Sequence, residues 1–132
     1  MVKNEIIKAL KEKGVSDIEE IKYKRGYLLV KFFYDFDDDE ISAARTYSNE
    51  EGTYESETEE WFKELYLPYL YDISLDNVEE YIEEITEEYE VQGQFVAYDV
   101  DINNPTFGEF LAIFSEDEED VDIDEVVEEL DL

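Results

Sequence analysis

Carboxylates and tyrosines are the side chains with which this chain could do chemistry. The sequence has 40 Asp and Glu, eleven Tyr and ten Lys and Arg, but no His and no Cys. The missing residue types exclude Ser-His-Asp and Cys-His nucleophile systems and zinc sites built from His or Cys. The five glycines are scattered and form no phosphate-binding loop. We therefore expect that the protein is not an enzyme and uses no cofactor.

Two aspartates offer an alternative to this expectation. Asp99 and Asp101 alternate in a segment that reads as a strand, so both side chains would point to one face, as in a metal-binding Asp-x-Asp motif. Phosphoryl-transfer sites also need Lys, Arg or a phosphate-cradling loop, and none lies nearby in the sequence. Solvated aspartates beside a turn are the simpler interpretation. The alternative hypothesis is a small carboxylate- or metal-dependent enzyme centred on Asp99 and Asp101.

Calcium binding by an EF-hand loop is not expected. Two aspartate-rich runs begin at Asp35 and Asp120. Both lack the glycine at position 6 and the glutamate at position 12 that such a loop requires. The sequence therefore predicts no metal site.

The most organised charge lies between residues 78 and 90. At 100° per residue, the apolar Val78, Ile82 and Ile85 share one side of a helix, and glutamates fill the opposite half. These glutamates are Glu79, Glu80, Glu83, Glu84, Glu87, Glu88 and Glu90. At about 1.5 Å per residue they span roughly 18 Å, or one charge per about 2.6 Å. Duplex DNA carries one charge per about 1.7 Å and each strand one per about 3.4 Å, so the charge density is comparable with that of nucleic acid.

The same glutamates repel one another along the helix. Four pairs at i, i+4 spacing destabilise it by roughly 1–2 kcal/mol in all. Lysines in place of Glu80, Glu84 and Glu88 should therefore stabilise the fold and abolish binding to a basic partner. A solvated face without a partner remains the alternative interpretation, and it predicts the gain in stability alone.

Charge is distributed unevenly along the whole chain. The net charge of −30 divides into +3 for residues 1–31 (eight basic, five acidic), −9 for 32–63 (two basic, eleven acidic) and −24 for 64–132 (24 acidic). The positive first segment argues against a salt-adapted protein, whose whole surface would be acidic. The electrostatic field of a protein with a net charge of −30 repels nucleic acid and anionic membranes and attracts basic proteins. We expect a basic protein partner, such as a nuclease or another nucleic-acid-binding enzyme, and no direct binding of nucleic acid or membrane.

Two further segments contribute to the expected partner-binding surface. Residues 116–120 are an acidic linker or interaction segment: Glu116, Asp117, Glu118, Glu119 and Asp120. The aromatic stretch Trp61–Tyr71 offers Tyr66, Tyr69 and Tyr71 as binding anchors if it is exposed. A helix end buried against the sheet is the alternative interpretation of this stretch. An exposed patch here would also suit a structural assembly subunit.

Helices and strands that must position these residues follow from periodicity and turn signals. The pattern predicts helices at 2–13, 57–67, 75–90 and 122–130 and strands at 18–24, 27–36, 94–101 and 109–115. Residues 40–48 read as a strand or a short helix, and we favour the strand. Gly14 should end the first helix, and Pro68 should kink or end the second. In the last helix, Ile123, Val126, Val127 and Leu130 share one side and should dock onto the body.

The order α-β-β-(β)-α-α-β-β-α predicts an α+β fold. Tight turns join the strands as hairpins, which predicts an antiparallel sheet of four to five strands with helices covering one face. A length of 132 residues fits a single domain, 1–132. The absence of cysteine and of any apolar run of 18 residues predicts a cytoplasmic protein.

These features favour an acidic binding protein that occupies the nucleic-acid-binding surface of its partner. A DNA or RNA mimic of this type would suit an anti-defence inhibitor or an immunity protein against a nuclease toxin.

Overall fold

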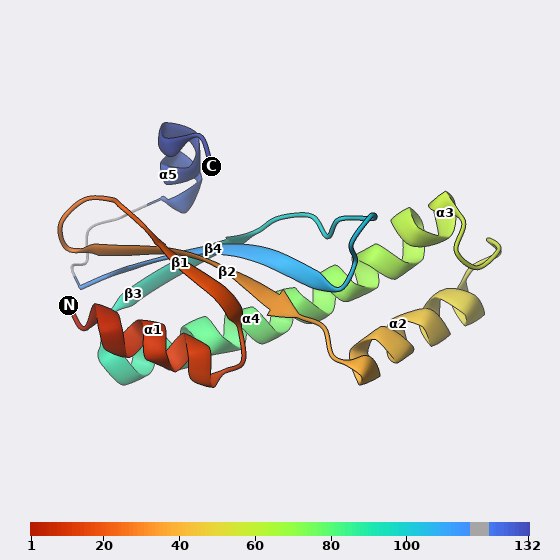
Figure 1. Ribbon diagram of the computed structural model, residues 1–132, viewed down its shortest axis with the longest axis horizontal. Helices are drawn as coiled ribbons and strands as arrows, with labels where there is room; N and C mark the ends of the chain where they lie inside the picture. Colours follow the sequence, from red (N-terminus) through yellow and green to blue (C-terminus); the bar gives the residue numbers. More distant parts are fainter. Residues whose placement is uncertain (117–121) are drawn as a thin grey trace.

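A four-stranded antiparallel sheet forms the centre of the computed structural model, which describes residues 1–116 and 122–132. Its strands are β1 (Ser16–Ile21), β2 (Tyr27–Asp35), β3 (Gln92–Ala97) and β4 (Phe107–Ser115). They lie in the order β1-β2-β4-β3, so β2 and β4 are central and β1 and β3 form the edges (Figure 1). β2 and β4 pair along their whole length, from Tyr27 opposite Ser115 to Asp35 opposite Phe107.

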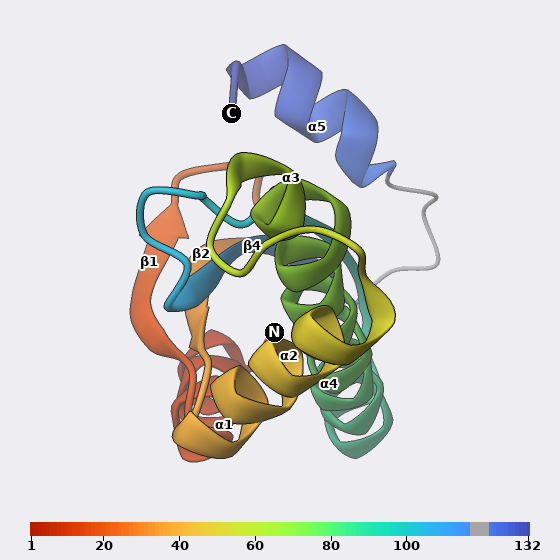
Figure 2. The same ribbon diagram turned by 90° about the vertical axis from the view of Figure 1, so that its right-hand side faces the viewer.

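Helices pack on both faces of this sheet. In chain order they are α1 (Lys3–Glu12), α2 (Asp38–Glu51), α3 (Glu59–Trp61), the π-helical η1 (Phe62–Tyr66), α4 (Leu67–Tyr89) and α5 (Ile123–Leu130). α1 and α4 cover one face, and α5 lies on the other (Figures 1 and 2). α2, α3 and the start of α4 extend beyond one end of the sheet (Figure 1). The predicted α+β fold and its element order are confirmed.

The second helical layer corrects the prediction that helices cover one face only. Leu28, Val30 and Phe32 of β2 are buried towards α1 and α4, as the alternation predicted. Leu29 points to the other face, where it packs in a second cluster with residues of β4 and α5. Ile123 and Val126 are buried there, with Val127 and Leu130 packed beside them, so the predicted docking of the last helix is confirmed.

Residues 40–48 form part of α2, and the favoured prediction of a strand is wrong. Asp37 is the N-cap of this helix, and its Oδ1 accepts a hydrogen bond from the Glu40 backbone N–H at 2.7 Å. The Glu40 carboxylate in turn accepts from the Asp37 N–H at 3.0 Å. This capping box satisfies two backbone donors and fixes the helix start directly after β2.

Pro68 does not end the helix in which it lies. It occupies the start of α4, after the wider turns of η1, and the helical path continues to Tyr89. Proline lacks a backbone N–H and cannot bond to the preceding turn, and the turn directly before it is the π-helical one of η1. The predicted helices 57–67 and 75–90 are therefore one path from Glu59 to Tyr89. Gly14 follows α1 with φ +95°, which confirms the predicted left-handed end.

Candidate protein-binding surface

The outer side of α4 carries the acidic face that the sequence predicted. Val78, Ile82 and Ile85 are at most 4% exposed and attach the helix to the core. All seven predicted glutamates on the other side are exposed: Glu79, Glu80, Glu83, Glu84, Glu87, Glu88 and Glu90. The last turn of α4 holds no basic residue, so the negative end of the helix dipole adds to the same field. The packed apolar side fixes the orientation of the helix, so these glutamates all extend from its outer side.

A lysine from α1 neutralises part of this face. The Lys13 ammonium forms an ion pair with the Glu84 carboxylate. The same ammonium lies 5.6 Å from the centre of the Tyr81 ring. Within residues 1–116 and 122–132, none of the other six glutamates forms an ion pair. The sequence did not reveal this contact, because Lys13 and Glu84 are 71 positions apart and no local pattern shows that α1 packs beside α4.

The end of α4 lies in a region of strongly negative charge. Burial raises the pKa of the Tyr89 hydroxyl, and the carboxylates of Glu88, Glu12 and Glu5 raise it further. Two of these carboxylates belong to α1, so the acidic face continues across the boundary between the two helices.

Glu116, the first residue of the predicted acidic run, lies next to the N-terminus. Its carboxylate accepts from the Met1 amino group at 2.5 Å. Asp117, Glu118, Glu119 and Asp120 lie outside the described residues. The predicted contribution of 116–120 to the surface therefore stays a prediction.

The aromatic stretch is mostly core, which corrects the prediction for Tyr66. Tyr66 is 3% exposed and stacks on the fully buried Trp61, with ring centres 4.9 Å apart. Trp61 donates its indole N–H to Asn49 at 3.2 Å. Tyr69 and Tyr71 are half-buried. Burial follows because Trp61 and Tyr66 face α2, so Tyr66 cannot anchor a partner in this conformation.

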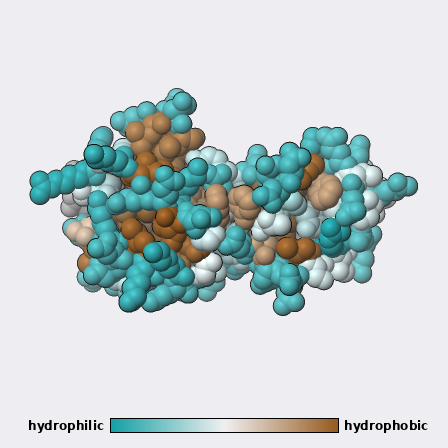
Figure 3. Space-filling view, viewed as in Figure 1, coloured by the Kyte–Doolittle hydropathy of each residue, from teal (hydrophilic) through white to brown (hydrophobic). Residues whose placement is uncertain are grey.

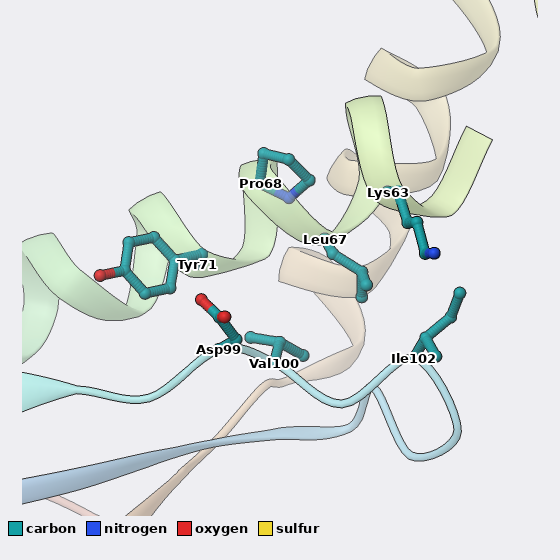
Figure 4. Close-up of a pocket in the computed structure, with 7 residues that line it drawn as sticks. All are labelled: Lys63, Leu67, Pro68, Tyr71, Asp99, Val100 and Ile102. Atoms are coloured by element: carbon teal, nitrogen blue, oxygen red, sulfur yellow. The ribbon is translucent and has the colours of Figure 1, made fainter. Parts of the chain in front are cut away.

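Asp99 and Asp101 do not form the paired site that a strand would have given. β3 ends at Ala97, and both aspartates lie in the loop that follows. Oδ1 of Asp101 accepts from the Asn103 backbone N–H at 2.9 Å, which stabilises a turn. Asp99 instead points towards Tyr71 (Figure 4). Within the described part of the chain, no three acidic side chains are placed to hold a metal ion.

A pocket of about 450 Å³ is lined by Asp99. Asp99 and Tyr71 lie at one end and Lys63 at the other (Figure 4). The rest of the lining is apolar: Leu67, Pro68, Val100 and Ile102. The Lys63 ammonium is paired with Glu59 at 2.6 Å. The pocket therefore offers one carboxylate, one phenol and a lysine that already has a partner, without a second carboxylate for acid–base or metal chemistry.

A groove beside α4 is the feature that sequence analysis missed. It has a volume of about 350 Å³ and lies between α4, the edge strand β3 and the first residue of α5. Glu79 and Glu83 line it from α4, and Gly93 and Phe95 line it from β3. The uncharged run Gln92–Ala97 was a possible signal, but the position of β3 at the sheet edge depends on strand order, which the sequence did not define.

Most of the surface seen in Figure 3 is hydrophilic, and apolar residues gather over α5 and the sheet below it. Among the described residues, only Val2, Tyr47, Tyr54 and Leu132 are large hydrophobic side chains that are exposed. None of the helices within residues 1–116 and 122–132 has the length and apolar character needed to cross a bilayer.

Comparison of the chain with protein-family models, with curated proteins and with solved structures finds no match. Function is therefore inferred from the acidic face of α4, the groove beside it and the pocket around Asp99.

Proposed function

We propose that the protein binds the nucleic-acid-binding surface of a basic partner protein through the exposed glutamates of α4. The observation that supports this most directly is a group of six exposed glutamates on one anchored helix, none of which forms an ion pair with another described residue. Over roughly 18 Å, six charges give one per about 3 Å. That density lies between a duplex and a single strand of DNA, so a groove that binds phosphates would also attract this face.

The repulsion within α4 is consistent with such a role. Glutamates four residues apart destabilise a helix by about 0.2–0.5 kcal/mol a pair, and a helix C-terminus favours cations over anions. α4 has four such pairs and no basic residue in its last turn. A basic partner would relieve this repulsion on binding. Without a partner, the repulsion between these glutamates would have no such compensation.

An inhibitor of host defence and an immunity protein against a nuclease toxin both suit this chemistry. A sequence without cysteine, and hence without disulfides, fits action in the cytoplasm, where such partners would be found. The enzyme hypothesis would need Asp99 and Asp101 side by side, whereas Asp99 lines a pocket and Asp101 accepts a hydrogen bond within a turn. The hypothesis of an assembly subunit needs an exposed aromatic patch, and Trp61 and Tyr66 are not available for it because both are buried.

The test is capture of the partner under competition. Immobilised protein should retain a basic protein from host lysate at low salt, and high salt or added duplex DNA or RNA should release it. Glu79→Lys with Glu83→Lys and Glu87→Lys should abolish capture.

A matched control changes the same charge elsewhere. Glu50, Glu51 and Glu55 are exposed at the far end of α2 and in the loop after it. Their replacement by Lys should leave capture intact, although the net charge changes from −30 to −24 in both variants. Equal loss in both would show that only total charge matters, and capture that resists salt and nucleic acid would refute the proposal.

A further inference from the structure

The two edges of the sheet are protected to different degrees. β1 carries Asp17 with φ +49°, and its register with β2 shifts between Ser16 and Glu19. It also bears Glu19 and Glu20, so bulge and charge both oppose pairing with another strand. β3 pairs with β4 in unbroken register from Gln92 to Ala97 and contains no charged residue. The β1 edge therefore resists pairing with an added strand, and the β3 edge has neither a bulge nor charged residues to prevent it.

The backbone of β3 has an outward-facing set of hydrogen-bonding groups. Tyr98 N–H donates to Glu109 C=O at 2.9 Å. Because antiparallel pairs alternate, every second residue before Tyr98 directs its backbone to β4, and the residues between direct theirs away. The outward set is Gly93, Phe95 and Ala97. Within the described residues, no strand pairs with this edge.

The side chains of these three residues do not block the edge. Phe95 and Ala97 pack against the core beneath α4. A Cβ on Gly93 would lie 2.7 Å from the Thr86 methyl carbon, so the backbone approaches α4 closely at this point. The outward N–H and C=O groups therefore border the groove beside α4.

Carboxylates line this groove on the α4 side, where Glu79 and Glu83 border it. On the other side, Ile123 at the start of α5 donates its N–H to the Gln94 side chain at 3.0 Å. An incoming strand would thus meet negative charge from α4.

The spacing of the carboxylates matches that of an extended chain. Glu79 and Glu83 are separated by about 6 Å along the axis of α4. Alternate residues of a strand, which share a face, are about 6.6–6.8 Å apart. α4 packs against β3 and runs alongside it in the opposite direction (Figure 1). Lysines or arginines two residues apart on an added strand could therefore reach both glutamates.

We infer that the edge of β3 takes up an extended basic segment of the partner as a fifth strand. Its backbone pairs with Gly93, Phe95 and Ala97, and its alternate Lys or Arg side chains bind Glu79 and Glu83. The inference rests on the proposed function, because it assumes a basic partner, and it adds the mode of binding. Main-chain pairing supplies affinity in such complexes, and the alternate side chains supply specificity.

The test uses a capped eight-residue peptide of alternating Lys and Val as the probe. Its binding should slow amide hydrogen exchange at Gly93, Phe95 and Ala97 by at least about tenfold. The same peptide with every second amide N-methylated keeps its charge but cannot pair, and it should lose at least about tenfold in affinity. A Glu–Val peptide should not bind.

Protein variants give a second measurement. Glu79→Gln with Glu83→Gln should weaken binding of the Lys–Val peptide about tenfold. The melting temperature should not fall, because the change removes repulsive pairs along α4. Asp72→Gln with Asp76→Gln removes two exposed charges of the same helix away from the groove and should have little effect.

The outcomes separate this inference from the proposed function. If the N-methylated and plain peptides bind equally and the three β3 amides stay unprotected, strand addition is overturned while the acidic face remains a binding surface. If neither high salt nor added nucleic acid reduces capture of the natural partner, the proposed function is refuted, whether or not the peptide binds at β3.

Discussion

A matched pair of lysine substitutions on α4 tests the charges of the acidic face most directly. Glu83 and Glu84 are neighbours on the exposed side of the helix, and each has glutamates four residues before and after it. Glu and Lys have similar helix propensities, and each substitution changes the net charge of −30 by the same amount. The variants differ in one contact, because only Glu84 is paired with Lys13.

The expected effects follow from pair energies. Glu83→Lys removes two repulsive pairs and forms two attractive ones, each about 0.2–0.5 kcal/mol, which gives a gain of about 0.8–2 kcal/mol. Glu84→Lys makes the same local gain. It also loses an exposed ion pair of about 0.2–1 kcal/mol and places two ammonium groups together at similar cost. The two effects of Glu84→Lys nearly cancel.

Thermal unfolding at low salt should resolve this difference. For 132 residues, the gain for Glu83→Lys corresponds to about 3–7 °C in melting temperature. Glu84→Lys should stay close to wild type, and the difference should shrink at high salt. Glu83→Lys should also weaken capture of the partner, so stability and affinity move in opposite directions. An equal rise in both variants would refute the Lys13 contact, and no rise in either would refute the repulsion along α4.

Three further predictions concern other parts of the molecule. Burial raises the pKa of the Tyr34 hydroxyl. The contribution of neutral Tyr34 to the stability of the fold is therefore complete below about pH 10, the ordinary pKa of tyrosine, and is lost as the pH rises further. Tyr34→Phe should flatten the alkaline fall in the free energy of unfolding, measured in urea, and a curve that still falls as steeply would contradict this cause. Gly93→Ala places a methyl group 2.7 Å from the Thr86 methyl carbon and should lower stability by about 1–3 kcal/mol in the same assay; an unchanged midpoint would show that β3 does not approach α4 so closely. Asp99→Ala with Asp101→Ala should leave partner capture unchanged, and a loss in a normally folded double variant would favour the enzyme hypothesis.

Elements with a strong local period were predictable from the sequence. Tyr27–Phe36 alternates apolar side chains, and the structure buries Leu28, Val30 and Phe32 on one face as that period requires. The last helix and the acidic side of α4 follow from a period of 3.6 in the same way. In each case local geometry alone decides which side chains share a face.

Features that depend on packing between distant segments were missed. The capping box of Asp37 and Glu40 is a local signal that favours a helix at 40–48, and the strand prediction did not use it. The second helical layer was indicated by Leu111 and Ile113, which alternate with buried residues on the opposite face of β4. Strand order placed β3 at an edge and thereby created the groove. No local pattern encodes that order, because pairing depends on the whole sheet.

The two sides of the acidic face differ, because basic residues lie on the α1 side. Lys8 and Lys11 are exposed on α1, and Lys13 of the same helix is paired with Glu84. A basic partner approaching α4 from the α1 side would therefore meet these lysines among the acidic Glu5 and Glu12, and a glutamate on α4 that is already neutralised. On the β3 side it would meet Glu79 and Glu83, which have no ion pair within the described residues, beside an edge that can accept backbone hydrogen bonds. Electrostatic steering acts before contact is made, so this asymmetry would direct an extended basic segment to the groove along β3.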